Sequence, residues 1–85
     1  MKINEQYLNE NGKTYTLLEF VLTRGSWDQN QAMLFTDEDR YSPYVICHDL
    51  TKGSNGLISW YHGNYVGKDQ EVAYKAWNEV LEQNK

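Results

Sequence analysis

Hydrophobic and polar residues alternate along much of the chain before residue 67, which is the pattern of β-strands. The clearest segment is 14–23, where β-branched and aromatic residues dominate and both faces are partly apolar, as in a central strand. Asn11-Gly12 precedes it, and because both residues tolerate a positive φ, the pair predicts a tight turn and a hairpin. The strands expected from these patterns lie at 3–8, 14–23, 32–35, 44–48 and 57–66.

The period of the pattern changes after Gly67. From Asp69 onward apolar residues recur at the offsets that place them on one stripe of an α-helix. The stripe consists of Val72, Ala73, Ala76, Trp77, Val80 and Leu81. Asp69 is suited to cap the N-terminus of this helix. An isolated helix of this length is marginal in water, so we expect it to pack on the sheet.

These elements predict a single α+β domain over residues 1–85. The expected architecture is an antiparallel meander sheet of four or five strands with one C-terminal amphipathic helix packed on one face. The opposite face would then remain uncovered, although it carries aromatic and aliphatic side chains. In a two-layer domain, the sheet face that contacts solvent is normally polar. We therefore expect a partner on that face, and a homodimer is one such arrangement.

The composition describes a small globular protein rich in aromatic residues. Of its 85 residues 40% are hydrophobic, and they include three Trp, seven Tyr and two Phe, which is more than a small core needs. Aromatic side chains left exposed favour a protein interface. The formal net charge is -4, which argues against direct nucleic-acid binding and permits binding to the basic surface of another protein.

The chain shows no sign of secretion or of a membrane span. Its start, Met1-Lys-Ile-Asn-Glu-Gln, has no apolar run, and no segment approaches the roughly 20 apolar residues that cross a bilayer. Cys47 is the single cysteine, so no intrachain disulfide can form. We expect a cytoplasmic protein.

Candidate catalytic residues are few. His48-Asp49 with His62 offers ligands for zinc, iron or manganese. However, neighbours on a strand point to opposite faces, and the two histidines share a face only if their strands pair in the right register. Cys47 lies in an apolar run, where cysteine is usually an inert small hydrophobe. There is no phosphate loop or nucleophile elbow, so we expect no enzyme, no metal site and no cofactor.

The run Asp37-Glu38-Asp39 permits two interpretations. Thr36 opens a sequence of the capping-box form, and Pro43 prevents the turn that it would cap from continuing as a helix. This structural interpretation makes the acids a solvated corner between two strands.

The electrostatic interpretation treats the same acids as part of a contact surface. Between residues 28 and 49 there are five acidic residues and one basic residue, Arg40. Carboxylates pair with arginine side chains, and interleaved aromatic residues supply anchors. The predicted partner-binding surface comprises Trp27, Asp28, Asp37, Glu38, Asp39, Tyr41 and Tyr44.

In its general build the chain resembles small acidic accessory proteins of bacteriophages and conjugative elements, such as anti-CRISPR and antirestriction inhibitors. The local similarities are Arg24-Gly-Ser-Trp27 and Trp60-Tyr-His-Gly-Asn-Tyr65, which leads into the helix. The resemblance implies an inhibitor of a host DNA-targeting defence protein that acts by binding, with the acidic segment in a basic nucleic-acid channel. The alternatives are a dimeric structural or regulatory module and a small metal-dependent enzyme using His48 and His62.

Overall fold

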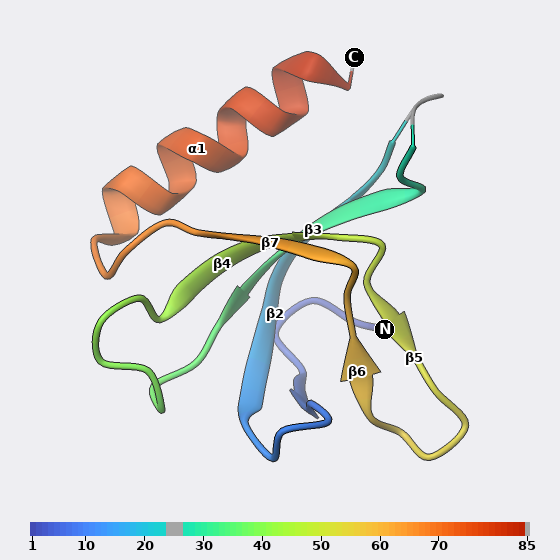
Figure 1. Cartoon of the computed structure of the whole chain (residues 1–85). Coiled ribbons are helices and arrows are strands. Elements are labelled where there is room, and N and C mark those ends of the chain that lie inside the picture. Colours follow the sequence, from blue (N-terminus) through green and yellow to red (C-terminus); the bar gives the residue numbers. More distant parts are fainter. Residues whose placement is uncertain (24–26, 85) are drawn as a thin grey trace.

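A computed structural model describes residues 1–23 and 27–84. Over these residues the chain forms an antiparallel sheet of five strands in the order β1-β2-β3-β4-β7, a two-stranded hairpin β5-β6 and one helix, α1 (Figure 1). The strands are β1 (Gln6–Leu8), β2 (Thr14–Leu22), β3 (Asn30–Phe35), β4 (Tyr44–His48), β5 (Thr51–Lys52), β6 (Ile58–Ser59) and β7 (His62–Tyr65), and the helix is α1 (Gln70–Gln83). The predicted α+β class with a C-terminal helix is confirmed.

The first hairpin joins β1 to β2 through the predicted tight turn. The side-chain oxygen of Asn9 accepts hydrogen bonds from the backbone N–H groups of Asn11 and Lys13, at 3.0 and 2.9 Å. Gly12 adopts a φ of 85°, which is the left-handed region that glycine enters at little cost. Further along β2 the register with β3 shifts between Leu17 and Glu19, so β2 contains a bulge.

The helix α1 begins and packs as its sequence predicts. Asp69 is its N-cap, and the carboxylate accepts the backbone N–H of Glu71 at 2.9 Å. The helix buries its apolar stripe on one face of the sheet, and Figure 1 shows it lying across that face. The buried cluster on this side comprises Met33, Ile46, Ala73, Trp77 and Val80. Val72 and Leu81, also predicted for the stripe, lie at its margins and remain exposed.

The expectation of an uncovered second face is wrong, because the chain covers that face itself. The β5-β6 hairpin folds beneath the sheet, opposite α1 (Figure 1). It brings Leu50 and Ile58 against residues of the main sheet, and Tyr7 and Trp60 pack around them. The sheet residues buried in this second cluster are Tyr15, Leu17, Ala32, Leu34, Val45 and Cys47. Sequence reasoning missed this layer because the strands that form it are two residues long.

The predicted long strand at 57–66 is interrupted. It consists of β6 under the sheet and β7 at the sheet edge, separated by Trp60 and Tyr61. The ring of Trp60 meets that of Tyr15 edge-on, with 5.3 Å between the ring centres. Trp60 therefore anchors the segment between β6 and β7 against the core. Gly63 lets the strand pass close by, since a Cβ there would lie 3.0 Å from Trp60 Nε1 and 3.2 Å from Val45 Cγ2. The described residues include no helix long and apolar enough to span a bilayer.

Candidate functional site

The seven residues predicted as one contact surface lie at opposite ends of the sheet. Trp27 and Asp28 precede β3, and the acids, Tyr41 and Tyr44 lie in or beside the loop that follows it. The length of β3 separates the two groups by about 20 Å at the usual rise per residue. The structure therefore does not bring these residues together into one surface.

In the acidic loop between β3 and β4, two of the three carboxylates hold the backbone. Asp39 accepts hydrogen bonds from the N–H groups of Ser42 and Tyr41, both at 3.0 Å. The bond from Ser42, followed by the bond from Tyr41, lowers the pKa of Asp39. Glu38 reaches across to accept the N–H of Thr14 at the start of β2. Glu38 and Asp39 thus hold the loop in place, which the structural interpretation of a solvated corner did not include. The segment forms a turn, and the Thr36 hydroxyl accepts the N–H of Glu38 there at 3.2 Å.

The aromatic residues of this loop are also partly engaged. The ring of Tyr44 contacts that of Phe35 at 5.0 Å and packs beside the helix-covered core. Tyr41 is 80% exposed, but the guanidinium of Arg40 lies 5.6 Å from the centre of its ring. The protein's own cation therefore already contacts the Tyr41 ring.

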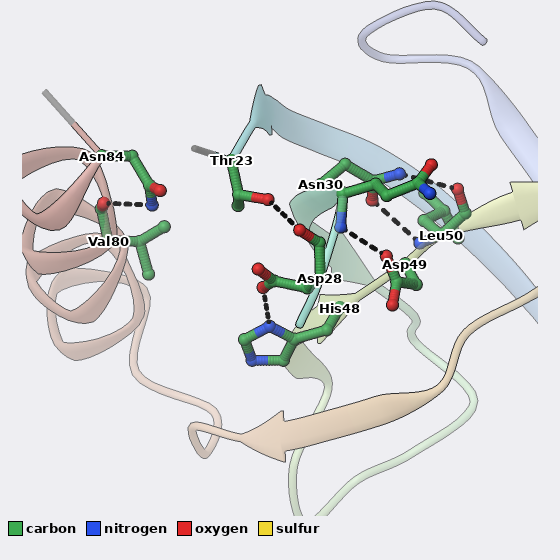
Figure 2. A network of polar contacts seen from close by, with 9 residues as sticks. Thr23, Asp28, Asn30, His48, Asp49, Leu50, Val80 and Asn84 are labelled. Atoms are coloured by element: carbon green, nitrogen blue, oxygen red, sulfur yellow. Dashed lines mark hydrogen bonds and ion pairs between the residues drawn. The ribbon is translucent and has the colours of Figure 1, made fainter. Parts of the chain in front are cut away.

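At the other end of β3, a network of polar contacts joins β3, β4 and the segment before β3 (Figure 2). Asp28 is buried, and its Oδ2 lies 2.6 Å from Nδ1 of His48. An ionised carboxylate has no proton to give, so Oδ2 of Asp28 accepts this hydrogen bond and Nδ1–H of His48 donates it. The Thr23 hydroxyl donates to the backbone carbonyl of Asp28 at 2.7 Å. The network thus fixes both the ring of His48 and the chain that carries Trp27.

Asp49 and Asn30 complete this network. Asp49 accepts the N–H of Gln29 at 2.7 Å, and the amide of Asn30 bonds to both backbone groups of Leu50. Among the described residues, no group of three or more His, Cys, Asp or Glu side chains is arranged to hold a metal ion. Cys47 is fully buried, and burial raises the pKa of its thiol to about 12, so it has no thiolate character at neutral pH.

Four rings meet on the surface beside the Asp28–His48 pair, and we call them the aromatic cluster: Trp27, His48, Tyr61 and His62. Trp27 lies 4.6 Å from His48, 6.0 Å from Tyr61 and 6.4 Å from His62, measured between ring centres. His48 and His62 are directly paired across β4 and β7, so the register condition for a shared face is met. Trp27 is 59% exposed and Tyr61 79% exposed, so two large rings of the cluster face solvent.

Sequence reasoning found only part of this cluster. It selected Trp27 and the buried Asp28, and it considered a common face for the two histidines. It missed Tyr61 as a surface residue, because the segment around it was expected to be continuous strand. The signal available was the run Trp60-Tyr61-His62, whose three large side chains cannot all point into one core.

Comparisons of the chain with known proteins found no relative. No protein-family model, curated protein or solved structure matches the chain. Of the run 24–27 that carries part of the resemblance to mobile-element inhibitors, residues 24–26 lie outside the described residues. The proposals below therefore depend on the chain's own geometry and charge.

Proposed function

We propose that the protein is a non-enzymatic binding protein that contacts a partner through the aromatic cluster. The observation that carries the proposal is the exposure of Trp27 and Tyr61 beside a rigid support of buried polar contacts. Tryptophan and tyrosine are the residues that most often dominate interface energetics. Both faces of the sheet are covered by the chain itself, so the core does not account for these two exposed rings.

The partner surface that fits best is cationic. The chain carries twelve acidic and eight basic residues, and its exposed rings present electron-rich faces to an arginine or lysine. The acidic loop between β3 and β4 would add long-range attraction rather than direct contact, since Glu38 and Asp39 already hold backbone groups.

The more specific proposal is an anti-CRISPR-like inhibitor, encoded by a phage or another mobile element and acting in the host cytoplasm. Its partner would be a host DNA-targeting defence protein, whose nucleic-acid channel must be basic to bind phosphates. Net acidity, small size and the resemblance in general build support this proposal. An inhibitor of this kind needs no chemistry, because occupying the channel is sufficient.

The test compares two exposed aromatic residues at opposite ends of the sheet. Immobilised wild-type protein, Trp27→Ala and Tyr41→Ala are used to capture proteins from a bacterial lysate, and the captured proteins are identified by mass spectrometry. We expect Trp27→Ala to lose a nucleic-acid-binding protein that Tyr41→Ala retains, and DNA added to the lysate should compete for it. Capture that is unchanged in Trp27→Ala, or lost only in Tyr41→Ala, would contradict the proposal.

A dimeric structural or regulatory module is the second candidate, and an open sheet edge favours it. β1 pairs with β2 at Thr14 to Thr16, and Asn4 and Glu5 bond to the backbone of Leu17. Beyond Leu17, β2 has no partner strand on that side among the described residues. Phe20 and Leu22, which lie on this stretch, are 39% and 70% exposed. Strand pairing between two copies would cover such an edge. Light scattering decides: a dimer that Leu22→Lys converts to monomer supports this candidate, and a wild-type monomer excludes it.

A further inference from the structure

A hollow of about 230 Å³ lies between the C-terminal half of α1 and the strands β3, β4 and β7. Its polar lining consists of Gln31, His48, Asn64, Glu79 and Gln83. The volume is below the roughly 300–1,000 Å³ of sites that enclose a whole small-molecule ligand. The hollow therefore has room for a single side chain or a group of similar size. It shares His48 with the aromatic cluster, so a molecule docked on Trp27 would reach it directly.

Gln31 is the polar group at the base of this hollow. It is 92% buried, standing between Val21 of β2 and His48 of β4 on the helix-covered face. Its side-chain amide makes no hydrogen bond to the described residues, and it lines the hollow. The nitrogen and oxygen of this amide keep some exposure to solvent, which they have through the hollow. Gln31 thus offers an oxygen acceptor to whatever enters.

The charge around the hollow favours a cation. Among the described residues that line it, Glu79 supplies a carboxylate, and neither lysine nor arginine is present. The amide oxygens of Asn64 and Gln83 add further acceptors at the rim. The hollow also lies toward the C-terminal end of α1, where the helix dipole is negative, and the last turn as described carries no basic residue.

We propose that this hollow is a subsite for one arginine side chain of the protein partner. Acceptors from β3, β7 and α1 surround the space, which suits the planar guanidinium with its five donors better than a compact ammonium group. Guanidinium groups also stack on aromatic rings, and His48 is among the residues that line the hollow. The proposal rests on the proposed function only in assigning the arginine to a protein partner.

The experiment measures arginine binding directly, with no partner present. ¹⁵N-labelled protein is titrated at neutral pH with N-acetyl-arginine amide, and N-acetyl-citrulline amide serves as the uncharged isostere. We expect the side-chain amide signals of Gln31, Asn64 and Gln83 to shift in a saturable way with arginine, with a Kd on the order of 1 mM for so small a probe. The citrulline probe should cause no saturable shift of these signals. The Kd of N-acetyl-lysine amide should be at least about threefold higher than that of the arginine probe.

Three variants locate the site. Glu79→Gln should raise the Kd for arginine about fivefold, which is the effect of losing one partly exposed ion pair. Gln31→Met fills the same space without an acceptor and should also weaken binding. Glu82→Gln, on the same helix but outside the hollow, makes the same charge change and should leave the Kd unaltered. Glu79 is exposed, so its variant remains informative if Gln31→Met does not fold.

Several outcomes would overturn the subsite. They are equal binding of citrulline or lysine, shifts confined to the acidic loop, no saturable shift, or equal effects of Glu79→Gln and Glu82→Gln. Failure of the proposed function has a different signature. Arginine would then bind in the hollow as expected, while Trp27→Ala would leave protein capture from the lysate unchanged.

Discussion

The contact between Asp28 and His48 should be the most strongly coupled polar pair on the surface that carries the aromatic cluster. Its atoms lie 2.6 Å apart, and the side chains are only 4% and 13% exposed, for Asp28 and His48 respectively. Hydrogen bonds to a charged group contribute about 1.5–3 kcal/mol, and breaking a fully buried pair costs about 3–5 kcal/mol. Because water still reaches the edge of His48, we expect a coupling free energy of about 2 kcal/mol, within the lower of these ranges.

The double-mutant cycle of Asp28→Ala and His48→Ala measures this coupling. Asp28→Ala alone should lower the free energy of unfolding by about 2–3 kcal/mol, which corresponds to a fall in Tm of about 10 °C or more in a domain of this size. Urea unfolding followed by tryptophan fluorescence gives all four free energies. The cycle removes the contributions that each residue makes to other neighbours, including the stacking of His48 on Trp27.

Asp37→Ala is the matched control, because Asp37 is an exposed carboxylate in the acidic loop at the other end of β3. Its effect on the free energy of unfolding should stay within about 0.5 kcal/mol. A coupling below about 0.5 kcal/mol between Asp28 and His48 would refute the reasoning, since that is the value of an exposed ion pair. The rigid support assigned to Trp27 would then be absent as well.

Three further predictions concern other parts of the chain. Gly63→Ala should lower the free energy of unfolding by about 1–3 kcal/mol in urea, because the added methyl group would press on the Trp60 indole; an unchanged midpoint would contradict the close approach. Asp39→Asn should destabilise the protein most at neutral pH. Backbone hydrogen bonds, chiefly the one from Ser42, lower the pKa of Asp39 in the folded protein. The contribution of Asp39 to the free energy of unfolding is therefore lost as the pH falls through and below the ordinary value of 3.8. The unfolding curves of the wild type and the variant should converge in acid and not in alkali. Cys47 should react with a thiol reagent only at the rate of unfolding, because the pKa of its thiol is about 12 and the side chain is buried; rapid reaction of the native protein would show that β4 opens locally.

The features that the sequence predicted correctly depend on neighbours along the chain. The Asn11-Gly12 turn and the Asp69 cap each act within a few residues, and both lie where their chemistry placed them. The 3.6-residue period likewise located α1 and the side that it buries. These signals determined the fold class because four of the five sheet strands, β1 to β4, follow one another directly along the chain.

The parts that were missed depend on contacts between distant segments. The β5-β6 hairpin has too few residues to show a strand pattern, yet it supplies Leu50 and Ile58 to a whole second core. The position of Tyr61 follows from the anchoring of Trp60 against Tyr15, which no local pattern encodes. In the acidic loop the charge is evident in the sequence, but the backbone hydrogen bonds that two of its carboxylates make are not.

The second core changes how the exposed aromatic residues should be understood. If one sheet face were bare, exposed rings would be expected over its whole area, and self-association would be the simplest explanation. Instead both faces are covered, and two of the exposed rings, those of Trp27 and Tyr61, meet where the segment before β3 approaches β4 and β7. A buried carboxylate there orients His48, and an unpaired amide, that of Gln31, opens into the adjoining hollow. Core packing requires neither feature, whereas recognition of a cationic side chain beside an aromatic anchor uses both.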